Sequence, residues 1–316
     1  MEMLKSIILI TGGTGMVGNA IKCISDSYHE YQFIYISSKD YDLTNFDSTE
    51  KMFLDHKPKY VIHLAACVGG LYKNMTQKIE MLEKNLQINF NVVKCSYLYK
   101  VKKLIACLST CIFPDKTSYP IDENMLHNGP PHNSNDAYAY AKRMLEIQCR
   151  LYRENCGCNF VCIIPTNIYG KYDNYSLEDG HVLPALIHKC FLAKQNSENF
   201  IIRGSGKPLR QFIYSEDLAK LIMNILFIDA PIDNIILSVP EKDEVSIETV
   251  ALIIAKCFDY EHRIVFDNKY SDGQYKKTAS NEKMTELFPN FEFTEISNGI
   301  QKTIEWFIEN FEKARI

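Results

Sequence analysis

Residues 7–20 read IILITGGTGMVGNA, and this stretch decides the fold class of the chain. Its first four residues are apolar and predict a buried parallel strand, which ends at a glycine turn before a helix-compatible segment near Met16. Gly12 suits the tight turn, Gly15 lets a pyrophosphate approach the backbone, and Gly18 allows the helix to pack closely against the strand. The helix N-terminus offers unpaired N–H groups and a partial positive charge. A purely structural turn is the alternative, but the order strand, glycine turn, helix favours a dinucleotide site in a doubly wound parallel α/β sheet.

The composition fits one large domain with a smaller lobe. The chain has 316 residues, of which 46% are hydrophobic, and a net charge of −4 that gives no reason to expect nucleic-acid or membrane binding. Eleven cysteines are scattered without a C-x-x-C pair or zinc-ligand spacing. We therefore expect reduced thiols, most of them buried, and no metal site. Because no stretch resembles a secretion signal or reaches transmembrane length, we expect a soluble cytoplasmic protein.

Further apolar runs predict the other strands of the sheet at residues 32–36, 60–64, 104–108 and 159–164. Between about residues 72 and 100, apolar residues recur at helical spacing and predict one long helix. Its apolar face, which includes Met81, Val92 and Val93, packs on its own sheet or meets another subunit.

The residues after the second strand predict which cofactor is bound. An NAD-preferring site usually has an acidic side chain here for the ribose 2′-OH, whereas this chain has Ser37, Ser38 and Lys39. Hydroxyls and an ammonium suit a 2′-phosphate, so NADP(H) is favoured, although Asp40 and Asp42 follow closely. Asp42 and Leu43 would lie under the adenine, or be a loop carboxylate and a packed leucine. Ala65 and Ala66, after the third strand, form a small-residue turn that would pass beneath the cofactor.

A candidate catalytic group follows the fourth strand. Tyr138 and Lys142 are four residues apart, so on a helix they share a face, and a nearby ammonium is expected to lower the pKa of the phenol. Tyr138 then becomes a usable acid near neutral pH. Ser109 lies at the carboxyl end of a central strand, where open α/β sheets bind ligands. Residues 115–136, rich in Pro, Asn, His and Gly, predict a structureless active-site loop between them.

These elements resemble a known family. A strand-end serine and Tyr-x-x-x-Lys after an N-terminal TGxxGxxG are similar to the extended short-chain dehydrogenase/reductases, which have a Rossmann-type sheet. STCIFP at 109–114, NGPPHNSN at 128–135, AKRM at 141–144, DGHVLP at 179–184 and SDGQYKKTAS at 271–280 more narrowly resemble the GDP-L-fucose synthases. The resemblance spans essentially the whole chain. It implies conversion of GDP-4-keto-6-deoxy-D-mannose to GDP-L-fucose by C3/C5 epimerisation and NADPH-dependent C4 reduction.

The resemblance also implies roles for individual residues. Ser109 and Tyr138 would stabilise the C4 oxygen in both reactions, Tyr138 would supply the proton, and Lys142 would hold the nicotinamide ribose. Cys111 would be the base of the epimerisation and His181 its acid; the alternatives are an inert cysteine and a structural histidine. The cofactor-binding residues expected from the motifs and the resemblance together are Gly12, Gly13, Thr14, Gly15, Met16, Val17, Gly18, Ser37, Ser38, Lys39, Asp42, Leu43, Ala65, Ala66, Leu108, Lys142, Pro165, Asn167, Ile168 and His181.

The resemblance places the substrate largely in the second part of the chain. Residues 1–170 are expected to form the NADP-binding domain and residues 171–316 mainly a lobe for the GDP-sugar, with some segments returning to the first domain. Ser246 would cap a helix of this lobe. The substrate contacts implied are Asn167, Lys189, Arg203, Arg210 and Asp272. Arg203 stands where the family commonly has tryptophan, and its guanidinium could stack on guanine or pair with phosphate. A homodimer is implied by the family alone.

Two other functions are consistent with part of the pattern. A related nucleotide-sugar epimerase or dehydratase would share the cofactor site, but such relatives often have a non-thiol residue where this chain has Cys111. A non-catalytic NADP-sensing module would have no need of Ser109, Tyr138 and Lys142, and these are all present.

Overall fold

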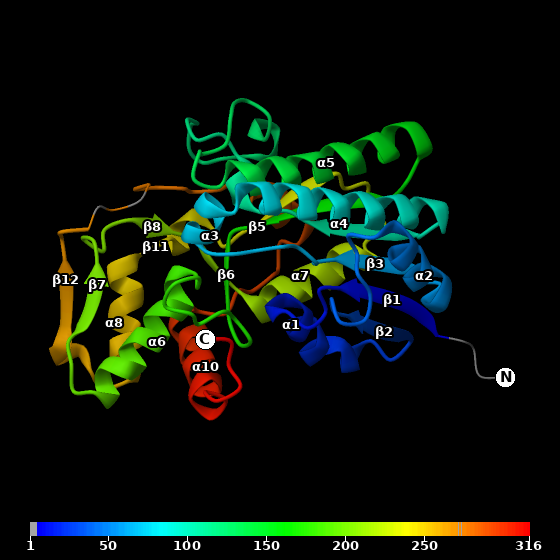
Figure 1. The fold of residues 1–316 in the computed structure, drawn as a ribbon. Helices are drawn as coiled ribbons and strands as arrows, with labels where there is room; N and C mark the ends of the chain where they lie inside the picture. The colour runs from blue at the N-terminus through cyan, green and yellow to red at the C-terminus, as the bar shows by residue number, and fades with distance from the viewer. Residues whose placement is uncertain (1–4, 271, 273) are drawn as a thin grey trace. The chain divides into compact units, whose positions relative to one another are not determined.

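The computed structural model describes residues 5–270, 272 and 274–316, and the chain divides into two compact units (Figure 1). Unit 1 contains the described residues up to Thr117 together with Glu123–Pro165 and Leu218–Leu237. Unit 2 contains Ser118–Asp122, Thr166–Asp217 and the described residues from Ser238 onward.

Unit 1 is built on a six-stranded sheet in which every pairing is parallel. The strands, in spatial order, are β2 (Tyr31–Ile36), β1 (Ser6–Thr11), β3 (Tyr60–His63), β4 (Lys103–Cys107), β5 (Phe160–Pro165) and β10 (Asn234–Leu237). Such a sheet is buried on both faces, and β3 and β5 are accordingly buried along their whole length. The doubly wound parallel fold predicted from residues 7–20 is confirmed.

Helices cover both faces of this sheet. In Figure 1, α1 (Met16–Ile24) and α7 (Ser215–Phe227) lie on one face, and α2 (Phe46–His56), α4 (Lys78–Leu98) and α5 (Asp136–Cys156) lie on the other. The strand order reverses at β1, since β2 pairs on one side of it and β3 on the other. The glycine turn after β1 therefore lies at the switch point where open α/β sheets bind nucleotides.

Two expectations about unit 1 need correction. The helix expected over residues 72–100 is two helices, α3 (Leu71–Thr76) and α4, because the backbone of Gln77 between them leaves the helical region. Met81, Val92 and Val93 are fully buried, so these three side chains pack inside the chain itself. Residues 115–136 are not structureless either: η3 (Glu123–Met125) is a short 3₁₀ helix, and Asp136 already begins α5.

The described part of unit 2 contains four helices, three strand pairs and an aromatic core. Tyr175 stacks on Phe307 at a centroid distance of 4.4 Å, and the partly buried Trp306 packs against this cluster. Ser246 caps α8 as predicted, because its side chain accepts from the Thr249 N–H. The elements are α6 (Val182–Gln195), α8 (Ile247–Cys257), α9 (Glu282–Leu287) and α10 (Ile296–Glu309), with the strand pairs β6 (Asn167–Tyr169) and β9 (Phe212–Tyr214), β7 (Phe200–Arg203) and β12 (Ile264–Asp267), and β8 (Leu209–Arg210) and β11 (Val245–Ser246).

The division between the units falls after Pro165 rather than after residue 170. The reason is that β6 pairs with β9, which places residues 166–170 in unit 2. Most of α7 and all of β10 return to unit 1. The remaining 3₁₀ helices are η1 (Ser25–Ser27), η2 (Thr110–Ile112), η4 (Glu241–Asp243) and η5 (Glu261–Arg263).

Two findings bear on the composition. All eleven cysteines are free thiols, but only Cys95, Cys149, Cys162 and Cys190 are buried, so the expectation that most would be buried is wrong. Among the described residues, no helix is both long enough and apolar enough to cross a membrane.

Candidate active site

In the glycine turn after β1, neighbouring backbone comes too close to Gly12 and Gly18 for a side chain to fit. Gly12 has φ +69°, and a Cβ atom there would lie 2.8 Å from the Ala65 nitrogen, so both conformation and space require glycine. A Cβ on Gly18 would lie 2.4 Å from the carbonyl oxygen of Gly13. Gly18 thus packs the first turn of α1 against the glycine turn itself rather than against the strand. Thr14 and Gly15, between them, are exposed to solvent.

These residues fit the diphosphate of a dinucleotide. Gly15 is the N-cap of α1 and makes no side-chain cap, and the first turn of α1 has no acidic residue. A Cβ on Gly15 would meet one atom within van der Waals range, the Gly12 oxygen at 3.3 Å, so space beside this backbone is open. Met16 and Val17 begin the helix whose N–H groups point toward that space. An anionic diphosphate is what this end of α1 can hold.

The segment predicted to bind the adenosine ribose already contains a negative charge. The backbone N–H and the hydroxyl of Ser37 both donate to the Asp40 carboxylate, at 2.7 and 2.6 Å. The hydroxyl bond and then the N–H bond lower the pKa of Asp40, which is therefore ionised near neutral pH. Ser38 and Lys39 are exposed and remain accessible to a 2′-phosphate.

The residues predicted beneath the adenine have different surroundings. Asp42 accepts from the N–H and the hydroxyl of Thr44, which hold its loop in place, and these bonds lower the pKa of Asp42. Leu43 is buried, with 7% of its surface exposed. Ala65 and Ala66 are partly exposed after β3, and the Ala65 N–H donates to the Thr11 hydroxyl at 3.3 Å. Ala65 therefore borders the glycine turn.

A buried histidine supports this turn and was not singled out by the sequence. His63 is fully buried, and its ring nitrogens lie 2.7 Å from the Thr11 hydroxyl and 3.1 Å from the Asn89 amide oxygen. Burial, followed by the positive charge of Lys142, lowers the pKa of His63 to about 3. His63 is thus neutral and links β1, β3 and α4.

His63 should make the protein sensitive to acid. Its pKa is about 3 when folded and 6.5 ordinarily, so the unfolded chain binds the extra proton between these values. The contribution of neutral His63 to the free energy of unfolding is fully present above pH 6.5. It is lost as the pH falls toward 3, by up to about 1.4 kcal/mol per pH unit. Urea unfolding at several pH values should show that the free energy of unfolding depends less steeply on pH in His63→Gln than in the parent. The exposed His29→Gln is the matched control. Identical slopes for parent and His63→Gln would contradict this account.

Ser109 and Cys111 lie in one short turn after β4. Leu108 is buried there, and its N–H donates to the Ile163 carbonyl at 2.8 Å. Ser109 is the N-cap of η2, and its oxygen accepts from the Cys111 N–H at 3.4 Å. Because the hydroxyl acts as an acceptor in this bond, its own proton is available to a ligand. Cys111 is half-buried in the same turn.

Tyr138 and Lys142 share a face of α5, as their spacing predicts. The Lys142 ammonium lies 5.8 Å from the centre of the Tyr138 ring and donates to the Cys107 carbonyl oxygen at 2.7 Å. The expected lowering of the phenol pKa is wrong for the protein alone. Burial, followed by the charges of Cys111, Cys107 and Cys67, raises the pKa of Tyr138 well above its ordinary value. Tyr138 is therefore a proton donor held firmly in its neutral form.

Unit 2 carries the other predicted residues of the reaction. His181 is the N-cap of α6, and desolvation followed by the Arg315 charge lowers its pKa. A lowered pKa keeps the imidazole neutral at pH 7 and makes it a weaker base. Pro165 ends β5 in unit 1, and Asn167 and Ile168 follow in β6 of unit 2. The side chain of Asn167 donates to the Gln211 carbonyl at 2.9 Å.

The structure brings several predicted substrate contacts together within unit 2. The Lys189 ammonium donates to the Ile201 carbonyl at 3.0 Å, and burial, followed by the charge of Arg203, lowers its pKa. Lys189 is therefore not simply a solvated lysine on a helix face. The Arg203 guanidinium lies 4.9 Å from the centre of the Tyr270 ring. Burial lowers the pKa of Arg210, which donates to the Leu209 carbonyl.

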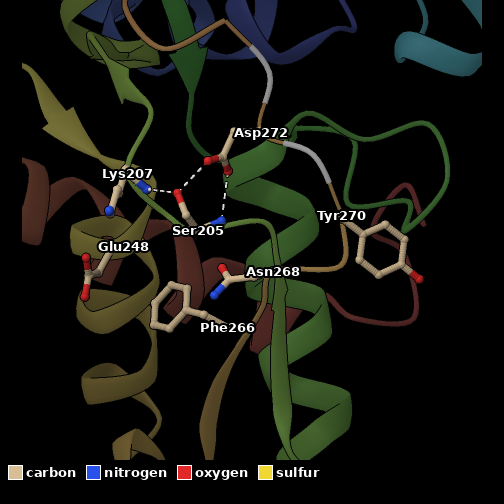
Figure 2. Close-up of a pocket in the computed structure, with 7 residues that line it drawn as sticks. All are labelled: Ser205, Lys207, Glu248, Phe266, Asn268, Tyr270 and Asp272. Carbon is tan, nitrogen blue, oxygen red and sulfur yellow. Dashed lines mark hydrogen bonds between the residues drawn. The ribbon is translucent and has the colours of Figure 1, made fainter.

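Asp272 lies at the edge of a cavity of about 580 Å³ (Figure 2). Its carboxylate accepts from the N–H and the hydroxyl of Ser205, at 2.8 and 2.5 Å, and Figure 2 shows these bonds on one side of the cavity. The hydroxyl bond and then the N–H bond lower the pKa of Asp272. Two residues of the SDGQYKKTAS motif, at positions 271 and 273, lie outside the described part. The sequence did not single out the other lining residues, which are Lys207, Glu248, Phe266, Asn268 and Tyr270.

The predicted residues are thus divided between the two units. Unit 1 holds the glycine turn, Ser109, Cys111, Tyr138 and Lys142, and unit 2 holds His181 and the basic residues. Arg143, next to Lys142 in the AKRM motif, was missed as a functional residue. It is buried, and its Nε donates to the Ile112 carbonyl in the turn that carries Cys111. Only its place beside Lys142 could have drawn attention to it.

Comparison with known proteins gives consistent matches. The profile of the family described as "NAD dependent epimerase/dehydratase family" matches residues 8–231. A curated protein of Dictyostelium discoideum, "GDP-L-fucose synthase", is 50% identical over 313 residues, which cover 98% of each chain. The "Probable GDP-L-fucose synthase" of Drosophila melanogaster is 46% identical over 317 residues, covering 98% of this chain and 99% of its own.

A solved structure matches over the same length. The GDP-L-fucose synthetase of Naegleria fowleri bound to NADP is 46% identical, with a TM-score of 0.94, and the match covers 100% of this chain and 97% of that one.

Proposed function

This chain belongs to the NAD dependent epimerase/dehydratase family and, within it, to the GDP-L-fucose synthases, and from this membership we propose that it converts GDP-4-keto-6-deoxy-D-mannose to GDP-L-fucose. It is an NADP-dependent oxidoreductase with epimerase activity. The observation that carries this conclusion is the 50% identity to a curated relative over 98% of both chains. The substrate is a GDP-sugar.

Both the epimerisation and the reduction develop negative charge on the C4 oxygen of the sugar. Carbons 3 and 5 flank the C4 ketone, so their protons become removable if the developing enolate oxygen is stabilised. A carbon is inverted when one group takes its proton and another returns a proton to the opposite face. Reduction at the same C4 then needs a hydride and a proton on the oxygen. One set of donors at the C4 oxygen can therefore serve both reactions.

We assign these tasks to residues of unit 1. Ser109 and Tyr138 donate to the C4 oxygen of the bound sugar, and Tyr138 gives its proton to that oxygen during reduction. A phenol kept neutral by burial suits this role, since the proton is present when the alkoxide forms. Cys111 takes the proton from carbon during epimerisation.

NADPH, when bound, supplies the hydride. The glycine turn and the N-terminus of α1 would hold its diphosphate, Ser38 and Lys39 its 2′-phosphate, and Lys142 its nicotinamide ribose.

Unit 2 would bind the nucleotide part of the substrate. Lys189, Arg203 and Arg210 supply positive charge suited to a diphosphate, and Arg203 already lies over the Tyr270 ring. His181 returns the proton to carbon. Because its pKa is lowered in the protein alone, this role requires that it gain a proton from the bound substrate or from solvent.

We further propose that the enzyme is a cytoplasmic homodimer. The exposed side of α4 and α5 carries large apolar side chains, among them Phe90, Leu98, Met144 and Leu151, each about half exposed. The two helices are neighbours, since the Gln148 side chain donates to the Phe90 carbonyl at 3.2 Å. An apolar surface spread over two adjacent helices is suited to pairing with a second copy.

Incubation with GDP-4-keto-6-deoxy-D-mannose and NADPH tests the function. NMR of the product should show GDP-L-fucose, inverted at C3 and C5 and reduced at C4, and NADH at equal concentration should support slower turnover. A product reduced at C4 without inversion would identify a simple reductase and refute the epimerase activity. Faster turnover with NADH would instead refute the assignment of Ser37, Ser38 and Lys39 to a 2′-phosphate.

A further inference from the structure

Arg143 connects helix α5 to the turn that carries Cys111. It follows Lys142 in the chain, and only 7% of its surface is exposed. Its Nε donates to the carbonyl oxygen of Ile112 at 2.7 Å, although the two residues are 31 positions apart. Ile112 is the last residue of η2, and Cys111 is the residue before it. The position of the Cys111 backbone therefore depends on this guanidinium.

The Arg143 guanidinium has a buried hydrogen-bond donor without a partner in the described part of the chain. Among the described residues, the Nη2 atom of Arg143 is shielded from solvent and has no hydrogen-bond partner. The Tyr140 ring centre lies 5.8 Å from the guanidinium carbon. Burying a cation with an unused donor is costly unless an anion is nearby. Cys111 is a titratable group close enough to act electrostatically on Arg143.

We propose that Arg143 is a positioning residue for epimerisation, which fixes the turn bearing Cys111 and favours the thiolate form of that side chain. The inference rests on the proposed role of Cys111 as the base. It adds a residue that touches neither substrate nor cofactor, and a reason why a half-buried thiol could act at neutral pH.

The charge balance around the thiol supports this role. Among the titratable groups in electrostatic contact with Cys111 are Lys142 and Arg143, both cationic, and Tyr138, which is neutral. The thiolate takes H⁺ from the carbon beside the ketone, the C–H electron pair moves to form the enolate, and Cys111 becomes a thiol. A neighbouring cation lowers the pKa of an acid by about one to three units. Arg143 thus raises the fraction of Cys111 that is ready to accept a proton.

The pH dependence of Cys111 alkylation tests the proposal directly. Iodoacetamide reacts with the thiolate, and mass spectrometry of the peptide that contains residue 111 separates it from the other cysteines. The quantity compared is the pH at which the alkylation rate of Cys111 is half of its maximum, called the midpoint. In Arg143→Gln, whose amide can still donate to the Ile112 carbonyl, this midpoint should rise by about one pH unit. In Arg143→Lys, which keeps the charge, the midpoint should stay near that of the parent. Arg150→Gln, on the exposed side of the same helix, is the matched control.

Substrate chemistry gives a second readout. Deuterium uptake from solvent at C3 and C5 should be about tenfold slower at pH 7 in Arg143→Gln and should recover as the pH rises by about one unit. A fold-only role would lower uptake equally at every pH.

Each outcome decides the proposal. Alkylation midpoints that coincide for Arg143→Gln and the parent overturn it. If Arg143→Gln does not fold, Arg143→Lys decides the proposal. An alkylation midpoint raised by about one pH unit in Arg143→Lys overturns the proposal, and an unchanged midpoint supports it. Alkylation needs no sugar, so the two proposals fail separately: a parent enzyme that forms no GDP-L-fucose refutes the proposed function, whereas coincident midpoints in an active enzyme refute only the role of Arg143.

Discussion

Tyr138→Phe is expected to lower C4 reduction by about 10²- to 10⁴-fold while leaving measurable deuterium exchange into the keto sugar. The change removes the hydroxyl that protonates the C4 oxygen and keeps the aromatic ring. Cys111 remains to abstract protons, and Ser109 remains as a donor to the enolate oxygen. Exchange should therefore slow but persist, because one of its two donors is lost, whereas reduction loses its acid.

The two activities can be followed in the same sample. NADPH oxidation reports reduction, and NMR or mass spectrometry of the sugar in D₂O reports exchange at C3 and C5. Tyr140→Phe is the matched control, since Tyr140 lies two residues away on the same helix and is 44% exposed. If Tyr138→Phe reduces the ketone as fast as the parent, another group is the acid. If it loses exchange as completely as reduction, the two reactions do not differ in their need for this hydroxyl.

Cys111→Ser has the second large expected effect, a loss of exchange of about 10²- to 10⁴-fold. A hydroxyl is nearly the same size as a thiol but is a far weaker acid, so its conjugate base is almost absent at neutral pH. Ser109, Tyr138 and Lys142 are unchanged, and the variant should still bind NADPH.

The measurement is deuterium uptake at C3 and C5 with cofactor withheld. Cys156→Ser, an exposed cysteine in the last turn of α5, should exchange at the parent rate. Uptake by Cys111→Ser equal to that of the parent would show that the thiol is not the base. The role of Arg143 would then lose its premise, although the alkylation profile would still report its charge.

Much of unit 1 could be predicted because its signals are local. The strand, glycine turn and helix of residues 7–20 are adjacent in sequence, and the positive φ of Gly12 together with its close approach to the Ala65 backbone favours glycine there. Tyr138 and Lys142 share a face simply because they are four apart on a helix. The break at Gln77 was missed, since apolar spacing continues across it and only the backbone dihedral angles reveal it.

Unit 2 and the electrostatics could not be predicted in the same way. The strand pairs of unit 2 are short, and β6 pairs with β9 across more than forty residues, as the contact of Asn167 with Gln211 shows. The pKa of Tyr138 moves opposite to the expectation from its spacing to Lys142. Spacing reveals which charge is near, but the loss of water around a group depends on everything packed against it.

The sequence by itself determined the individual strands typical of a parallel sheet, the dinucleotide turn and the shared face of Tyr138 and Lys142, because each of these signals lies in residues within a few positions of one another. Only the tertiary structure decided that Lys142 donates to Cys107, that His63 is buried neutral, and that Arg143 holds the turn of Cys111. These contacts join residues tens of positions apart, and their energies depend on burial. A local sequence pattern reveals neither which distant residues come into contact nor how deeply they are buried.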